Sequence, residues 1–428
     1  MLSPRRPVSP SSRQLRTSSQ RCYASPSPRR IDCRFAPWLV AAAFLALLPF
    51  PAAAQDTPSA RGFDHFYSLE YDQALAEFEK AAQQDPSAVG PHNHIAQTLL
   101  YREMYRNGAL ETELISGNNP FLRQKKLNPS PQIEKEFADE VRKAMDMANA
   151  RLAKKPDDTS ALYARGVAFG LRANYNFLVR KAWRDALRDT TSARQDCNRV
   201  TELDPSNYDA RLIQGVHDYV VGSLPWTWRL LGFLAGFHGD KERGLQTLEE
   251  VARKGNLNKT DAQGLLCALY RREHQPRKAI PLLEDLLRRF PRNHLLLFEQ
   301  AQMYSDLGNK EKAIAAIERV AAMKKSGLPG YAGVSWEKIY FQLGTIQFWY
   351  NDLDHALDNL QKVTVSRNEV DLNTGVLAWM RVGQIYDMTN RRAQAIEAYK
   401  RAIAFAPEAD AAKESRSYMS SPYRREKS

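Results

Sequence analysis

The chain has 428 residues, of which 61 are Lys or Arg and 49 are Asp or Glu, so its formal net charge is +12. This length exceeds one ordinary hydrophobic core, so we expect several domains or a modular array. With 43% hydrophobic and 26% charged residues, the composition excludes a wholly disordered chain, a collagen and a polytopic membrane protein, and four cysteines exclude a disulfide-stapled scaffold.

The first segment, residues 1–54, differs from the rest of the chain. It carries eight arginines and one acidic residue, which is +7 of the +12 and leaves +5 on the other residues. Its basic part is followed by an apolar run from Ala36 to Phe50 and then by small residues that end at Ala54. This pattern is typical of a secretory signal peptide, so we expect cleavage after Ala54 and a periplasmic or secreted mature protein. The alternatives are an uncleaved N-terminal anchor and a mitochondrial presequence.

Beyond residue 55 no alternation typical of strands stands out, and a regular spacing recurs instead. A small residue is followed twelve positions later by alanine, and twelve positions later again by proline. The clearest examples are Gly62–Ala74–Pro86, Cys267–Ala279–Pro291 and Gly383–Ala395–Pro407. Small residues let the two helices of a hairpin approach closely, and proline cannot continue a helix. The spacing therefore predicts a series of helix hairpins.

The hairpins resemble the tetratricopeptide repeat family, whose period is 34 residues. The stretches LLCALYRREHQPRKAIPLLEDLLRRFPRN and LAWMRVGQIYDMTNRRAQAIEAYKRAIAFAPEA follow the family pattern, and Trp379 stands at its tryptophan position. The resemblance covers residues 55–410 and implies an all-α, right-handed solenoid that binds proteins. We expect eight to nine units, among them 89–124 and 125–158, followed by a polar C-terminal tail at 411–428 that frays.

Two consecutive units, 159–207 and 208–257, are longer than the pattern. The second includes the apolar segment 219–237, with one charged residue. Its candidate binding residues are Trp226, Trp228, Phe233 and Phe237. One interpretation is an exposed ledge for a lipid, an envelope polymer, a membrane surface or a partner helix. The other is that both units have lengthened helices that pack on each other as additional core. Residues 219–245 also resemble part of the tetratricopeptide repeat domain 39 family, which implies little beyond a shared long unit.

The sequence contains none of the common catalytic, dinucleotide-binding or metalloprotease motifs, so we expect no enzyme activity, no cofactor and no metal site. Outside the first segment the arginines are interleaved with acidic residues, which disfavours nucleic acid as a partner. Cys197 and Cys267 fall on apolar helical faces, which favours buried free thiols over a disulfide.

The functional prediction is therefore a surface that binds a protein or peptide. The family resemblance implies a concave groove lined by the first helix of each hairpin. The candidates on it are Tyr163, Arg271, Arg272, Phe298, Phe341, Phe348, Trp349, Met380 and Asp387. Such a set suits an extended peptide or a helix with apolar anchors. The alternative for several of them, Phe348 and Trp349 especially, is packing between helices. We interpret the chain as an exported, non-catalytic scaffold, with lipid or envelope-polymer binding through 219–237 as the alternative.

Overall fold

The computed structural model describes residues 56–107, 110, 127–223, 238–366 and 370–425. The described residues belong to one compact unit within Gln55–Ser428, and residues 1–54 form no part of it. The predicted signal peptide lies outside the described residues, and all structural statements below concern this unit.

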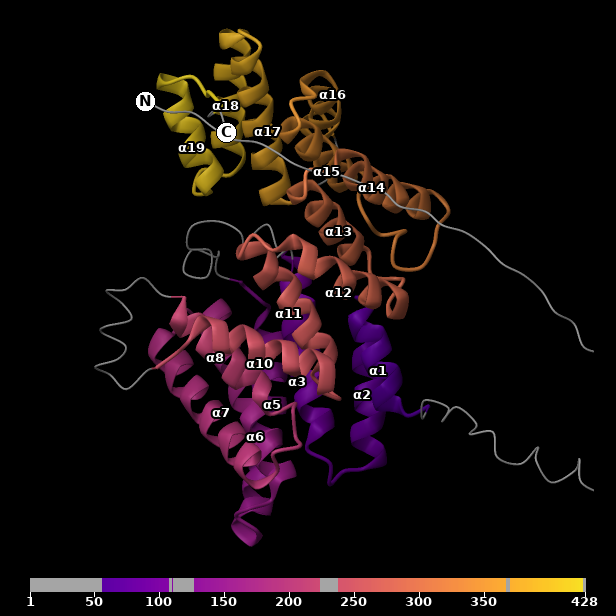
Figure 1. Cartoon of the computed structure of the whole chain (residues 1–428), viewed down its shortest axis with the longest axis vertical. Helices are drawn as coiled ribbons and strands as arrows, with labels where there is room; N and C mark the ends of the chain where they lie inside the picture. Colours follow the sequence, from indigo (N-terminus) through magenta and orange to yellow (C-terminus); the bar gives the residue numbers. More distant parts are fainter. Residues whose placement is uncertain (1–55, 108–109, 111–126, 224–237, 367–369, 426–428) are drawn as a thin grey trace, which may run out of the picture. The chain divides into compact units, whose positions relative to one another are not determined.

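The described residues form seventeen α-helices and one π-helical turn, with no strand among them (Figure 1). In chain order these are α1 (Pro58–Tyr67), α2 (Tyr71–Gln84), α3 (Gly90–Arg106), α5 (Pro131–Lys154), α6 (Thr159–Tyr175), η2 (Asn176–Arg180), α7 (Trp183–Leu203), α8 (Arg211–Gly222), α10 (Lys241–Lys254), α11 (Lys259–Arg272), α12 (Pro276–Arg289), α13 (His294–Asp306), α14 (Lys310–Lys325), α15 (Trp336–Trp349), α16 (Leu353–Thr364), α17 (Leu372–Met388), α18 (Arg392–Phe405) and α19 (Asp410–Ser420).

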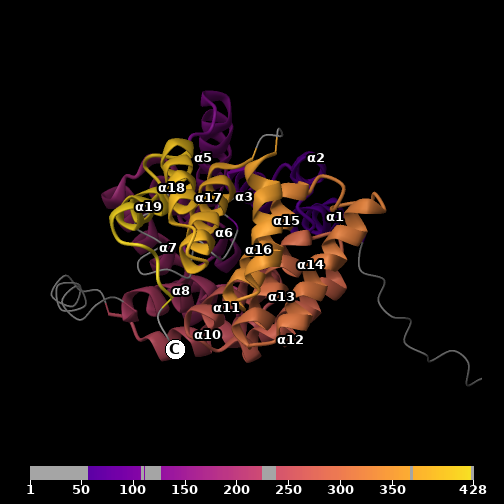
Figure 2. The same ribbon diagram turned by 90° about the horizontal axis from the view of Figure 1, so that it is seen from above.

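The helices pack in consecutive pairs, and each pair also contacts the next one (Figures 1 and 2). Eight pairs result, from α1–α2 to α17–α18, and α19 packs on the last. The all-α solenoid of helix hairpins is therefore confirmed. The predicted units 89–124 and 125–158 need correction, because their described helices, α3 and α5, pair with each other as one hairpin.

The twelve-residue spacing has the predicted physical basis. A side chain added at Gly62 would collide with the Phe78 ring, and one added at Gly383 would collide with the Tyr399 ring. Ala395 on the second helix of the last pair is completely buried. In these two hairpins the small residue therefore makes room for an aromatic side chain of the facing helix, whereas Gly215 and Gly344 make room for Leu248 and Leu360 in the same way.

In the long unit 159–207 the additional residues lengthen the hairpin. Tyr175, at the end of α6, stacks on the Phe137 ring of α5 with centroids 4.3 Å apart, and Val179 in η2 is buried. The additional residues of this unit thus belong to the core, but the stacking contact is with α5 and not with the second long unit, on which the interpretation placed it. In the unit 208–257, α8 and α10 still pack closely, and Tyr219 is buried.

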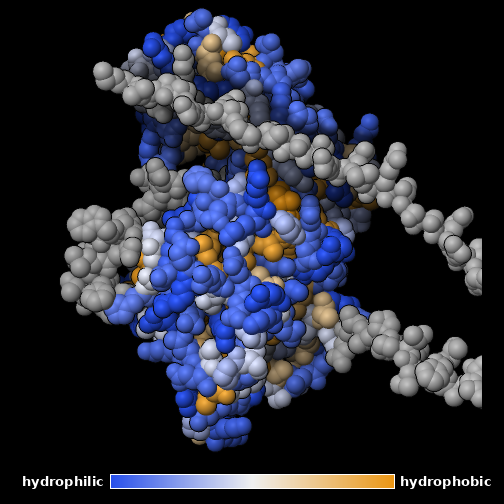
Figure 3. Space-filling model, in the orientation of Figure 1, coloured by the Kyte–Doolittle hydropathy of each residue, from blue (hydrophilic) through white to orange (hydrophobic). Residues whose placement is uncertain are grey.

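The apolar ledge was predicted at residues 219–237. Most of that segment, including Trp226, Trp228, Phe233 and Phe237, lies outside the described residues. No described helix combines the length and apolar character needed to cross a membrane. On the face shown in Figure 3, hydrophilic residues cover most of the described surface, and hydrophobic ones are confined to smaller areas.

The C-terminal region is more ordered than predicted. Instead of fraying from residue 411, the chain forms α19, which buries Ala411, Ala412 and Ser415 against α18. The small side chains on one face let this polar helix pack closely, a feature that its overall composition obscures. Ser421 has an extended backbone conformation, and residues 422–425 form no regular secondary structure.

The N-terminal hairpin makes contacts far along the chain. Arg292, between α12 and α13, pairs with Asp64 at 2.6 Å and with Glu70 at 2.8 Å. The Tyr67 hydroxyl donates a hydrogen bond to Asp261 at 3.0 Å. The first hairpin therefore packs against helices more than 190 residues away, in addition to its neighbour in sequence.

Candidate functional site

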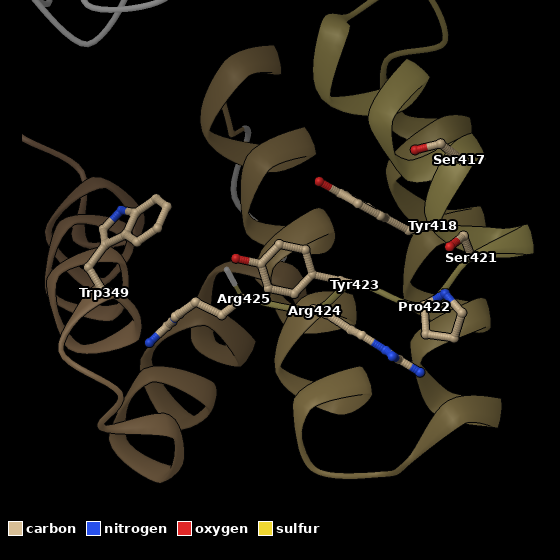
Figure 4. Close-up of a pocket in the computed structure, with 8 residues that line it drawn as sticks. All are labelled: Trp349, Ser417, Tyr418, Ser421, Pro422, Tyr423, Arg424 and Arg425. Atoms are coloured by element: carbon tan, nitrogen blue, oxygen red, sulfur yellow. The ribbon is translucent and has the colours of Figure 1, made fainter. Parts of the chain in front are cut away.

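An extended segment of the chain lies across the last hairpins, on the surface formed by α15 and α17. This C-terminal groove consists of Phe348, Trp349, Arg381 and Asp387, and the tail segment on it is residues 421–425. Beside the tail segment is a pocket of about 530 Å³ (Figure 4). Its lining residues are Trp349, Ser417, Tyr418, Ser421, Pro422, Tyr423, Arg424 and Arg425.

Asp387 is the polar centre of the C-terminal groove. Its side chain has no exposed surface, and its carboxylate accepts hydrogen bonds from three groups. The donors are the Arg392 guanidinium, the Tyr399 hydroxyl and the backbone N–H of Tyr423, each at 2.8 Å. A buried carboxylate is costly unless donors surround it, so the tail segment satisfies part of this requirement. Burial and the bond to Asp387 together raise the pKa of Tyr399 far above its usual range.

The aromatic part of the groove is the pair Phe348 and Trp349 at the end of α15. Their ring centroids are 5.2 Å apart in an edge-to-face arrangement. The guanidinium of Arg425 lies 4.6 Å from the Phe348 centroid and 5.8 Å from that of Trp349. The Arg381 guanidinium lies 4.8 Å from both. Guanidinium groups at these distances are attracted to the ring faces, so the pair is suited to holding arginine.

Arg425 also binds the backbone. It donates a hydrogen bond of 2.6 Å to the carbonyl oxygen of Phe348, in the last turn of α15. Carbonyl groups at a helix C-terminus carry partial negative charge, which favours a cation there. The position thus offers an arginine both a flat aromatic surface and an acceptor for its N–H groups.

The end of α19 directs the tail segment into the groove. Arg392 donates hydrogen bonds to the carbonyl oxygens of Tyr418 and Met419 at 2.8 and 2.7 Å, while its other nitrogen holds Asp387. Figure 4 shows Trp349 facing the side of the segment that carries Tyr423 and Arg425. The same guanidinium therefore positions both the carboxylate and the chain that binds it.

Three of the predicted partner-binding residues, Phe348, Trp349 and Asp387, come together in the C-terminal groove. Trp349 is 53% exposed, whereas Phe348 is completely covered, in part by Arg425. Four residues of the site were not predicted from the sequence. Arg381 and Arg392 were not among the candidates, and Tyr423 and Arg425 fall in the tail that was expected to fray. The only sequence signal for them was an aromatic residue and two arginines after a proline.

The structure places three other candidates inside the hairpins, which corrects the prediction that they face a partner. Phe298, Phe341 and Met380 are 6%, 1% and 5% exposed and pack in the hydrophobic core. Each of them lies on the first helix of its hairpin, on the side that the neighbouring helices cover. Burial between helices was the alternative for this set, and it holds for these three.

The remaining candidates, Arg271, Arg272 and Tyr163, have partners within the chain. Arg271 donates hydrogen bonds to Asp306 at 2.8 Å and to Gln302 at 3.0 Å. Arg272 lies 5.8 Å from the centroid of the Tyr219 ring. Burial and the nearby carboxylates, among them Asp261, raise the pKa of Tyr163. None of the three belongs to the C-terminal groove.

The described residues offer little else for ligand chemistry. No group of three or more His, Cys, Asp or Glu side chains in them is arranged to hold a metal ion. Cys197 and Cys267 are free and buried, as predicted. The burial of each raises its pKa, so the thiolate form needed for nucleophilic chemistry is suppressed.

Two family models match parts of the chain. Residues 224–337 match Iml2/Tetratricopeptide repeat protein 39, and residues 376–408 match the Tetratricopeptide repeat. Both resemblances proposed from the sequence are thereby confirmed. No curated protein sequence matches the chain.

Several solved structures are similar to this chain. A chain of the APC/C hetero-tetramer Cut9-Hcn1 is 13% identical with a TM-score of 0.47, and the match covers 86% of this chain and 56% of that one. The human IFIT1 dimer with m7Gppp-AAAA is 15% identical with a TM-score of 0.41, covering 84% and 83%. Yeast Tom70 is 11% identical with a TM-score of 0.36, covering 86% and 89%. This chain thus spans little more than half of the Cut9-Hcn1 chain that it matches.

Proposed function

Because the chain contains tetratricopeptide repeats, we propose that it is a non-catalytic scaffold that binds a protein partner through the C-terminal groove. The observation that carries this proposal is the extended segment bound there. Asp387 accepts its main-chain N–H, and Phe348 and Trp349 receive its arginine. A surface that holds one peptide segment by a main-chain hydrogen bond and an arginine anchor has the properties needed to hold another.

Trp349 is the best anchor for a partner. It is 53% exposed, and tryptophan contributes more binding energy at interfaces than most residues. It adjoins the pocket of about 530 Å³, which has room for a partner side chain. No described contact supports lipid or polymer binding through residues 219–237.

The experiment is affinity capture from a cell-envelope extract, with each recovered protein identified by mass spectrometry. We compare the wild type with Trp349→Glu, and use Trp183→Glu as the matched control, since Trp183 on α7 is 42% exposed and lies outside the groove. A partner of the groove should be recovered by the wild type and the control and lost with Trp349→Glu. Equal recovery by both variants would refute the proposal.

We also propose that the protein is exported, on the basis of the basic region, apolar run and alanines in residues 1–54. The test is N-terminal sequencing of the protein purified from its native cells. A mature chain that begins at Gln55 is the expected result. A chain that still begins at Met1 contradicts cleavage, and its cell fraction then shows whether the segment acts as an uncleaved anchor.

A further inference from the structure

We propose that the tail segment, residues 421–425, is a tethered ligand of the C-terminal groove, and that a protein partner binds by displacing it. The partner segment would share its chemistry: an extended backbone with an aromatic side chain and, two residues later, an arginine. This inference rests on the proposed function and specifies the ligand class and the regulation of the same groove.

The contacts of the tail segment with the groove are ones that a separate peptide can also make. Its main-chain N–H at Tyr423 donates to Asp387 at 2.8 Å, and its Arg425 side chain donates to the Phe348 carbonyl at 2.6 Å. Neither bond depends on the covalent connection to α19. A peptide of the same sequence, supplied from outside, can therefore form both.

The second argument is that the groove selects for the residues that occupy it. Arg425 meets two aromatic rings and a helix-terminal carbonyl, a combination that suits a planar guanidinium better than the compact charge of lysine. The Tyr423 ring packs edge-to-face on Tyr418 with centroids 5.3 Å apart, and lies 6.2 Å from the Phe348 centroid. The tyrosine and the arginine thus each have a defined position.

The third argument is that the attachment makes the tail segment a strong competitor. The segment begins at Ser421, whose backbone is extended and which directly follows the end of α19, and Arg392 holds the carbonyls of Tyr418 and Met419 in place. A short connection keeps the effective concentration of the segment near the groove on the order of millimolar. An external peptide binds only when the tail segment leaves the groove. Substitutions that weaken the binding of the tail segment should therefore raise the apparent affinity of the groove for an external peptide.

The test measures binding of a fluorescent peptide with the sequence SSPYRREKS, which corresponds to residues 420–428, to the full-length protein by anisotropy. Arg425→Ala weakens the tail segment, and the double variant Tyr423→Ala/Arg425→Ala weakens it further. The control is Arg416→Ala, which removes the same charge from α19, where the side chain is exposed and donates to the Pro407 carbonyl.

We expect the double variant to bind the peptide about tenfold more tightly than the wild type, with Arg425→Ala between them and Arg416→Ala equal to the wild type. Adding Trp349→Ala to the double variant should remove the gain. A peptide in which lysine replaces the arginine corresponding to Arg425 should bind the double variant more weakly than the original. Equal circular dichroism spectra and unfolding midpoints show that the variants remain folded, as expected for Tyr423→Ala and Arg425→Ala, which lie beyond the last helix, and for substitutions of the exposed side chains of Arg416 and Trp349.

The proposal is overturned if the double variant binds the peptide no better than the wild type, or if its binding is insensitive to Trp349→Ala. It is also overturned if the wild type is a dimer that the double variant dissociates, because the tail segment then binds a second copy. None of these results decides the proposed function. That is refuted only when Trp349→Glu and Trp183→Glu recover the same proteins.

Discussion

His294 is the residue whose protonation should most clearly limit the stability of this protein in acid. It begins α13 and is 7% exposed. Its Nδ1–H donates a hydrogen bond to the Gly330 carbonyl at 2.8 Å, and its Nε2 lies 3.5 Å from the Tyr105 hydroxyl on α3. Its pKa falls from 6.5 to about 4, mainly because of burial; the bond to Gly330 raises it and the charge of Lys338 lowers it, both by less than burial does.

The direction of the pH effect follows from comparing proton binding by His294 in the folded and unfolded protein. The folded protein keeps His294 neutral down to about pH 4, whereas the unfolded chain takes up the proton near pH 6.5. Between these values the unfolded state binds more protons, so stability present above pH 6.5 is lost as the pH falls. From the two pKa values the loss between pH 8 and pH 5 is about 2 kcal/mol for this side chain.

The assay is urea-induced unfolding of the wild type, His294→Phe and the control His355→Phe, at pH 8 and at pH 5. The side chain of His355 is 74% exposed on α16, and its pair with Asp352 at 2.7 Å is therefore screened by solvent, so its replacement should change the pH dependence much less than replacement of His294. We expect the free energy of unfolding to fall by about 2 kcal/mol less for His294→Phe than for the wild type between the two pH values.

Other groups contribute equally to all three proteins and cancel in the comparison. Burial lowers the pKa of His94 to about 4, which adds a second acid-induced loss. Burial raises the pKa of Asp261 from 3.8 to about 6. The folded state therefore binds a proton there more readily than the unfolded state, and this group increases the stability of the protein as the pH falls through this range. Equal pH dependence of the wild type and His294→Phe would refute the reasoning.

Three further predictions concern packing, thiol reactivity and long-range contacts. Gly244→Ala should destabilise the protein by about 1–3 kcal/mol in urea unfolding, because a Cβ there collides with the backbone of α8. Gly264→Ala, with nothing within 4 Å of the new atom, should stabilise it by about 0.5–1 kcal/mol, and the reverse order would contradict this packing. Cys197, whose pKa burial raises to about 12, should react with a thiol reagent such as dithionitrobenzoate only when denaturant unfolds the protein, and rapid labelling of the native protein would show that the site opens. Arg292→Ala should cost about 1 kcal/mol and accelerate amide hydrogen exchange in α1, measured by mass spectrometry, whereas Arg288→Ala, which removes an ion pair with Asp285 within α12, should leave that exchange unchanged.

The helix hairpins could be predicted from the sequence because their closure is a local requirement. Gly383, Ala395 and Tyr399 are close in the chain, and the aromatic ring needs a small residue opposite it. A spacing that repeats along the chain therefore carries the fold class without reference to distant residues. The unit that contains α3 and α5 was divided wrongly because α3 ends at Arg106 and α5 begins only at Pro131, a spacing that a fixed period cannot represent.

The candidate site could be predicted only in part. Trp349 and Asp387 were found because their positions on the first helices determine which side they face. Phe341 and Met380 occur on the same helices, but neighbouring hairpins cover them, and this depends on the packing of the whole stack.

The sequence by itself determined that this chain is a series of helix hairpins, and it indicated Phe348, Trp349 and Asp387 as residues of a surface near its end. Only the tertiary structure decided what lies on that surface. Residues 421–425 have no helical period or apolar face, and their order comes from partners 36 and 77 residues earlier, the Asp387 carboxylate and the Phe348 carbonyl. Arg292 likewise meets Asp64 across 228 residues. Contacts of this kind leave no pattern in the local sequence, because the energy that orders each segment is supplied by the folded partner.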